Sequence, residues 1–297
     1  KNAQTVDAYI AIGGGKVVDA GKCIAHRLKV PVIVVPSLAS NDAPCSALSV
    51  IYSPEGVVAA VEFFPENPAL VLVDTGVVAA AEARHLVAGI GDAMATWYEA
   101  RVCAENKRAT NALGGRPTLA GTAIAELCAK TIFEDGLAAV EAVQASIVTD
   151  ELERVVEANI LLSGVGFESG GLALAHGLAS GYTVVSHVHK HFLHGEMVAM
   201  GLLTQLVIED RIDEAREVGQ FFIKVGLPVH LGQLGLEATN MEELNAIVRN
   251  TLTSAIVANM PFEVTETALL SALLAADKLG LEITAADGDE AYRQLQA

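Results

Sequence analysis

The sequence predicts a short α/β region followed by an all-α helical bundle. Short β-branched runs bounded by glycine and proline occur in roughly the first 80 residues, whereas the rest is rich in Ala, Leu, Glu and Met at helical spacing. A chain of 297 residues, 52% of them hydrophobic, can bury more than one compact core. We therefore predict an incomplete α/β domain over residues 1–80 and a helical domain over residues 81–297.

The α/β region begins with a strand, a glycine turn and a helix. Tyr9–Ile12 is a short apolar run that ends in Gly13–Gly15, and Lys16–Lys29 shows helical periodicity. The unbroken β-branched run Val32–Val35, bounded by prolines, is typical of a parallel strand covered on both faces. Together these segments predict a βαβ unit of the Rossmann-like kind.

Three more strands are expected before the helices begin. Leu48–Ser53 and Val57–Phe63 flank Pro54-Glu55-Gly56, whose residues are typical of a hairpin turn. Leu70–Val73 is a further apolar run that ends at an aspartate. Strand candidates nearly disappear after it, so we expect the domain boundary near Ala80.

Composition excludes several classes of partner. The balance of 19 Lys+Arg against 36 Asp+Glu gives a formal charge of −17, which repels nucleic acid and anionic membrane surfaces. The long charge-free stretch Ser169–Val188 contains Gly, Ser and His and is a poor match to a bilayer span. Cysteines are scattered without a CxxC pair, so we expect reduced thiols in a soluble cytoplasmic protein.

The glycine turn and the loop after the second strand are candidate ligand sites. Backbone N–H groups and the helix dipole at Gly13–Lys16 favour an anion such as a pyrophosphate. A strand-to-helix turn also needs glycine for conformational reasons alone, so both interpretations stay open. The loop Pro36–Cys45 carries two serines, an asparagine and Asp42 where open α/β sheets bind ligands, although polar surface loops have similar compositions.

One carboxylate and two imidazoles in apolar helical surroundings are candidate metal ligands. Asp92, His176 and His194 each stand among small or apolar residues. Singly, each is more often a hydrogen-bonded core residue than a ligand, and the histidines within 187–194 could form a solvated loop that binds metals loosely. As a set, three ligands with room for water or substrate are what catalytic zinc prefers.

These motifs resemble the metal-dependent alcohol dehydrogenases of the iron-containing type, and among them the glycerol dehydrogenase branch. The resemblance covers nearly the whole chain and implies a dehydroquinate synthase-like fold. It is carried, in order, by Gly13–Lys16, Pro36–Ser46, Gly89–Ala93, Ser163–Gly171 with His176, and His194–Glu196.

The resemblance implies NAD-dependent oxidation of glycerol and related vicinal diols to dihydroxyacetone. Asp92, His176 and His194 would be the zinc ligands and catalytic residues and would contact the substrate, while Asp42 would contact polyol hydroxyls. The residues implied to bind NAD are Gly14, Gly15, Lys16, Ser37, Ser46, Leu48 and Tyr52. Ser37 replaces the usual threonine of the branch and keeps its hydroxyl.

The resemblance also bears on the metal and on assembly. Iron-using relatives have an additional histidine one helical turn after the metal aspartate, and Thr96 occupies that position here. A set of Asp, His and His therefore favours zinc over iron. The family forms large homo-oligomers, so self-association, with an octamer as one possibility, is expected.

One departure affects the expected activity. The family begins with another βαβ portion before the glycine turn, and nothing here corresponds to it, while the opening Lys1-Asn2-Ala3-Gln4 does not look like a natural start. We therefore expect an N-terminally truncated chain with an open sheet flank, which leaves a catalytically silent, zinc-binding, self-associating protein as an alternative. A glycerol phosphate dehydrogenase or a dehydroquinate synthase-like lyase would need a basic pocket, for which Lys190 is the one nearby cation in the sequence.

Overall fold

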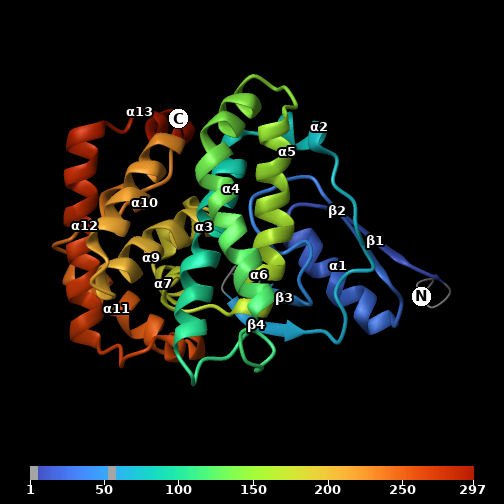
Figure 1. The fold of residues 1–297 in the computed structure, drawn as a ribbon, viewed down its shortest axis with the longest axis horizontal. Helices are drawn as coiled ribbons and strands as arrows, with labels where there is room; N and C mark the ends of the chain where they lie inside the picture. Colours follow the sequence, from blue (N-terminus) through green and yellow to red (C-terminus); the bar gives the residue numbers. More distant parts are fainter. Residues whose placement is uncertain (1–5, 53–57) are drawn as a thin grey trace.

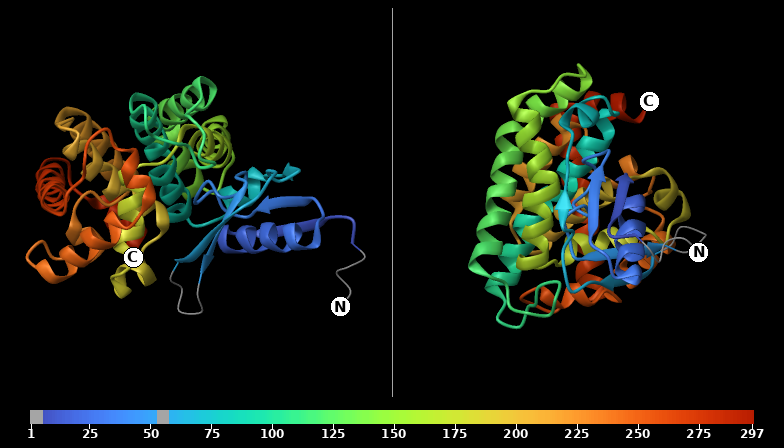
Figure 2. Two further views of the ribbon diagram at one scale, coloured as in Figure 1. Left: turned by 90° about the horizontal axis from the view of Figure 1, so that it is seen from below. Right: turned by 90° about the vertical axis from the view of Figure 1, so that its right-hand side faces the viewer.

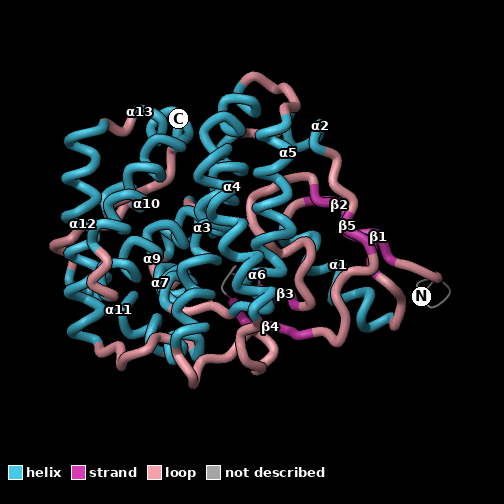
Figure 3. Tube along the Cα trace, viewed as in Figure 1, coloured by secondary structure: helices cyan, strands magenta, loops and turns pink. Residues whose placement is uncertain are grey.

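The computed structural model describes residues 6–52 and 58–297, in which a small α/β region projects from a larger helical body (Figures 1 and 2). Strands gather at one end of the molecule and helices make up the rest (Figure 3). The elements of the α/β region are β1 (Tyr9–Gly13), α1 (Gly15–Leu28), β2 (Val32–Pro36), β3 (Leu48–Tyr52), β4 (Val58–Phe63) and β5 (Leu70–Val71). The predicted strands and helix are therefore confirmed in order and type.

A parallel three-stranded sheet forms the centre of the α/β region. Its order is β1-β2-β5, with Tyr9 opposite Val32 and Ile33 opposite Leu70. Helix α1 packs against β1 so closely that a Cβ on Gly21 would lie 2.3 Å from the Cβ of Ala11. The predicted βαβ unit is confirmed. The last strand ends two residues before the predicted Val73.

Strands β3 and β4 form a separate antiparallel pair. Leu48 lies opposite Phe63 and Val50 opposite Val61, with a register irregularity after Ile51. The predicted pairing is confirmed, whereas the turn predicted at Pro54–Gly56 falls outside the described residues. This strand pair lies beside α1, which separates it from the parallel sheet (Figure 1).

Helices account for all regular structure after β5 in the described part of the chain. They are α2 (Thr75–Ala79), α3 (Ala83–Glu105), α4 (Leu119–Gln144), α5 (Asp150–Glu157), the π-helix η2 (Ala158–Leu162), α6 (Ser163–Gly170), α7 (Leu174–Tyr182), α8 (Ser186–His191), α9 (His194–Ile208), α10 (Ile212–Val225), the 3₁₀-helices η3 (Leu231–Leu234) and η4 (Ala255–Asn259), α11 (Met241–Leu252), α12 (Glu266–Asp287) and α13 (Glu290–Gln296). This confirms the helical second part. The division near Ala80, which falls between α2 and α3, stays a prediction.

The core of the helical body is built around α3, α7 and α9. Helix α9 carries apolar residues on every side, since neighbouring helices surround it, and Met200, Leu202 and Leu203 are fully buried. In the described ranges no single helix has both the length and the apolar composition to cross a membrane. Two successive helical segments, Asp150–Gly170 and Leu174–Tyr182, meet the length and composition criteria when they are taken together, but they are bent by 108° relative to each other.

Candidate active site

The three predicted metal ligands lie together although they are far apart in sequence. Asp92 is in the middle of α3, His176 is in the first turn of α7, and His194 is the first residue of α9. The Asp92 Oδ1 atom is 3.2 Å from His176 Nε2 and 3.4 Å from His194 Nε2. One ligand atom from each side chain lies within 4.8 Å of the others, and in the described residues this is the one group of three suited to a metal ion.

Glycines let these helices cross with their backbones in contact. A Cβ on Gly195 would lie 1.7 Å from the carbonyl oxygen of Ala88, and one on Gly91 would lie 2.5 Å from the carbonyl oxygen of Gly195. In the same way, a Cβ on Gly201 would lie 2.4 Å from the carbonyl oxygen of Ala175. Side chains at these positions would push the helices apart. The glycines therefore bring the three candidate ligands within reach of one ion.

The ligand group is closed on one side and open on the other. The Asp92 side chain is 1% exposed, that of His176 is 10% exposed and that of His194 is 45% exposed. Burial raises the pKa of the Asp92 carboxyl, but His194, His176 and the Asp42 N–H outweigh this effect and hold the pKa below its usual value. Asp92 is therefore ionised inside the protein, with the open approach on the side of His194.

A second carboxylate, Glu99, holds His176 from behind. It is fully buried, and its Oε2 lies 2.5 Å from Nδ1 of His176. Burial lowers the pKa of His176, but Glu99 and Asp92 raise it well above the usual value. Sequence analysis missed Glu99. The available signal was its position seven residues after Asp92, two turns along the same face of an apolar helix.

A partly buried ion pair between Arg84 and Glu196 anchors the start of α9, where His194 stands. The Glu196 carboxylate accepts hydrogen bonds from the Leu193 N–H at 2.7 Å and from Arg84 Nε and Nη2, each at 2.8 Å. Gln296 on α13 donates a further bond to Glu196 at 2.8 Å. Partial burial, together with the neighbouring His176, lowers the pKa of His194, which favours the neutral imidazole that binds metals.

Asp42 lies directly against the ligand group. Its N–H donates to Asp92 Oδ2 at 3.2 Å, and its own Oδ2 accepts a bond from Ser163 Oγ at 2.7 Å. Burial and the Asp92 carboxylate raise the pKa of Asp42 to about 8. Thr96, at the position of the extra histidine in iron-using relatives, lies 2.8 Å from Ser163 Oγ through its hydroxyl and is fully buried.

The loop that carries Asp42 is tied to the helical body at several points. Asn159 Nδ2 donates to the carbonyl of Ala39 at 3.0 Å, and Glu168 Oε1 accepts the N–H of Ala47 at 3.2 Å. The Cys45 thiol donates to the carbonyl of Ile160, within the π-helix η2, at 2.8 Å. The role of Asn159 was not predicted, because its partner lies 120 residues away. These bonds fix Asp42 relative to Asp92.

The predicted anion site lies at the start of α1. Gly14 is the N-cap residue, and no side chain caps this 14-residue helix. A Cβ on Gly15 would lie 2.6 Å from Asn41 Nδ2, so glycine leaves space at the first turn. The Ser37 N–H donates to the carbonyl of Gly13 at 3.0 Å and places Ser37 beside the turn, while Lys16 is the second residue of α1. A helix N-terminus with small residues and no side-chain cap suits a phosphate.

The other predicted NAD contacts lie in different surroundings. The Ser46 side chain is buried, and its hydroxyl bonds to the carbonyl of Ala43 at 3.3 Å. Buried Lys22 on α1 lies 3.4 Å from that hydroxyl and also donates to the carbonyl of half-buried Leu48. The side chain of Tyr52 lies outside the described residues. The NAD contacts of all these residues stay predictions.

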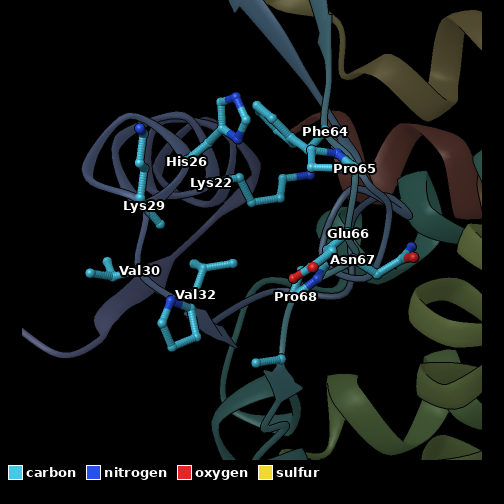
Figure 4. Close-up of a pocket in the computed structure, with 13 residues that line it drawn as sticks. Lys22, His26, Lys29, Val30, Val32, Phe64, Pro65, Glu66, Asn67 and Pro68 are labelled. Atoms are coloured by element: carbon cyan, nitrogen blue, oxygen red, sulfur yellow. The ribbon is translucent and has the colours of Figure 1, made fainter.

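Two cavities lie apart from the candidate ligands. One of about 520 Å³ opens between the second half of α1 and residues 64–69, where Lys22, His26 and Glu66 line it (Figure 4). Another of about 700 Å³ is lined by His187, Lys190 and His191 among others. The histidine cluster of the sequence is therefore divided, since His194 joins the ligand group while two of the others line a separate cavity.

Comparison with known proteins places this architecture in a family. A model of the iron-containing alcohol dehydrogenases matches residues 1–75. Glycerol dehydrogenases of Thermotoga maritima and Escherichia coli are 46% and 48% identical over 279 residues, which is 93% and 92% of this chain and 76% and 74% of theirs. The crystal structure of glycerol dehydrogenase from Schizosaccharomyces pombe matches with a TM-score of 0.91 at 37% identity, covering 96% of this chain and 73% of that one. The chain therefore belongs to the glycerol dehydrogenases within the iron-containing alcohol dehydrogenase family.

Proposed function

We propose that this oxidoreductase oxidises glycerol and related vicinal diols to dihydroxyacetone-type ketones, with NAD as the hydride acceptor and zinc at Asp92, His176 and His194. The observation that carries the proposal is the convergence of one carboxylate and two imidazoles from three helices, with ligand atoms within 4.8 Å. Family membership supports the substrate class, because the relatives compared above are named glycerol dehydrogenases.

The donor set fits zinc as the metal. Three protein ligands that include two histidines and leave a position for substrate are typical of catalytic zinc sites. Thr96 offers no fourth nitrogen ligand, and its hydroxyl already bonds with Ser163 at 2.8 Å. A bound zinc ion would lower the pKa of a coordinated alcohol, as it lowers that of water from about 16 to about 7.

The protein's own residues would orient the substrate around this group. Half-exposed His194 leaves an approach for a diol, while buried Asp92 supplies a fixed negative charge. Asp42, held by Ser163 and fixed against Asp92, is placed to bond a hydroxyl away from the reacting carbon. The open first turn of α1 would hold the cofactor phosphates, so that Gly14, Gly15 and Lys16 set where NAD lies.

The experiment is NADH formation from glycerol by the zinc-loaded chain, with and without a chelator. Turnover that the chelator removes and added zinc restores is the expected result. Turnover unaffected by the chelator would refute the metal assignment. In the same assay Asp42→Asn should reduce activity on glycerol more than on a simple primary alcohol, by about tenfold or more, because it weakens one oriented hydrogen bond. An equal loss on both substrates would make Asp42 structural.

Calorimetric titration with NAD distinguishes the proposed dehydrogenase from the alternative of a catalytically silent zinc-binding protein. NAD binding together with chelator-sensitive turnover excludes it, whereas zinc binding without NAD binding supports it. The phosphate-substrate alternatives are not favoured, because Lys190, the cation they would require, lines a cavity that contains none of the three candidate ligands. We also propose homo-oligomer formation, which light scattering of the purified chain tests.

A further inference from the structure

The Glu99 carboxylate makes three hydrogen bonds, all to the start of the helix that carries His176. Oε1 accepts the N–H of Ala173 at 2.8 Å and the N–H of His176 at 3.0 Å. Oε2 faces the ring nitrogen Nδ1 of His176 at 2.5 Å. The side chain of Glu99 is 0% exposed, so water does not compete for these bonds. Glu99 therefore holds both the backbone and the ring of one residue.

Helix α7 has no cap of its own to replace these bonds. Its N-cap residue, Ala173, has no side chain that could accept from the first N–H groups. Glu99 supplies the acceptor from α3, and Asp92 on the same helix contacts the other ring nitrogen of His176 at 3.2 Å. Two carboxylates seven residues apart, about 10 Å along a helix, thus hold one imidazole at both ends.

The direction of the bond to Glu99 determines which ring nitrogen of His176 is available to a metal ion. An ionised carboxylate can only accept, so the bond to Glu99 requires the proton on Nδ1 of His176. By the same rule ionised Asp92, 3.2 Å from Nε2, faces a proton there in the metal-free chain. A metal ion bound by Asp92 would replace that proton, whereas the proton on Nδ1 stays with Glu99. We propose that Glu99 is a positioning residue that sets the tautomer and orientation of His176 for metal binding. This inference rests on the proposed metal function of Asp92, His176 and His194.

The most informative substitution is Glu99→Gln, which keeps the size of the side chain. The amide oxygen can still accept the two backbone N–H groups, but the amide NH₂ donates to Nδ1 and so moves the ring proton to Nε2. We expect zinc affinity to fall about 10- to 100-fold, the usual loss when such a partner of a metal-bound histidine is removed. The melting temperature of the metal-free chain should change far less than for Glu99→Ala, which also removes the helix cap.

The matched control is Asp277→Asn. Asp277 is also buried, at 6% exposure, and its Oδ1 accepts the N–H of Leu231 at 2.8 Å, without contact to the candidate ligands. Zinc affinity of this variant should equal that of the unmodified chain. Zinc affinity is measured by adding zinc to the metal-stripped chain in competition with a chelating dye. The Asp92→Asn variant, which lacks one candidate ligand, gives the zinc affinity expected when the site is absent.

Each outcome has a distinct meaning. Weaker zinc binding by Glu99→Gln, but not by Asp277→Asn, supports the positioning role. Equal zinc affinity in Glu99→Gln and the unmodified chain overturns that role and leaves the proposed function intact. If the unmodified chain binds zinc no better than Asp92→Asn, both the role and the metal assignment fail.

A second measurement needs no substitution and so does not depend on a variant that folds. Nitrogen-15 NMR of the zinc-loaded, histidine-labelled chain distinguishes the two ring nitrogens of His176. A proton on Nδ1 and metal on Nε2 is the expected result. Metal on Nδ1 would overturn the inference, because Glu99 would then have no proton to accept.

Discussion

The candidate metal group and the glycine turn differ in what holds them in place. Asp92 is surrounded by closely crossed helices and is fully buried. The sheet that leads to the glycine turn instead leaves apolar side chains exposed, with Ile10 at 57% and Ile12 at 66% on β1, which pairs with β2 alone among the described residues. The metal site should therefore form independently of the nucleotide site. The loop that bears Asp42 connects the two.

The largest expected effect separates the two sites. Asp92→Asn should lower turnover by at least about 10⁴-fold, because it removes the charged ligand of a metal that supplies several kcal/mol of stabilisation. The NAD dissociation constant, measured by calorimetry, should change little. Full activity of this variant at limiting zinc would contradict the metal assignment. A parallel loss of NAD binding would show that the sites are not independent.

The next largest effect is expected where helices α3 and α9 cross with their backbones in contact. Gly195→Ala should lower the free energy of unfolding by about 3 kcal/mol, because a Cβ there would overpack against backbone that cannot move aside. Denaturant unfolding measures the change. Gly115→Ala is the control, since its nearest atom beyond chain neighbours, Asn111 Oδ1, is 3.4 Å from an added Cβ. Equal stability of the two variants would mean that the crossing tolerates a side chain.

A smaller effect is expected at the glycine turn. Gly15→Ala should weaken NAD binding about tenfold, since a methyl group would displace Asn41 and partly fill the first turn of α1, a cost of about 1.4 kcal/mol. Zinc affinity should remain unchanged. A loss of zinc affinity in this variant would contradict the independence of the two sites.

The sequence singled out the three side chains that lie together, Asp92, His176 and His194, but not the residues that hold them in place. Apolar runs and glycines predicted β1, the glycine turn, α1 and β2, because the signals for these elements are local in the sequence. The strand expected at Leu70–Val73 ends at Val71, where pairing with β2 stops. The bonds from Glu99 to His176 and from Asn159 to Ala39 join residues 77 and 120 positions apart. Local patterns carry no information about such pairings.

The smallest effect concerns thiol chemistry. All four cysteines are buried, and burial raises the pKa of Cys45 and of Cys103 to about 12. A raised pKa keeps the thiol neutral below that pH, so alkylation at pH 8 should require opening of the structure. Mass spectrometry of labelled peptides should find Cys23, on the less enclosed α/β region, modified before Cys103. The reverse order would contradict the difference between the two regions.

Three helices of this chain are proposed to hold one catalytic metal ion. A crystal of the zinc-loaded chain, measured at the zinc absorption edge, locates the ion directly. A single strong anomalous peak is expected about 2.0–2.2 Å from Asp92 Oδ and from Nε2 of His176 and His194. A main peak at another site, such as beside His187 and His191, or no peak between the three helices, would contradict it.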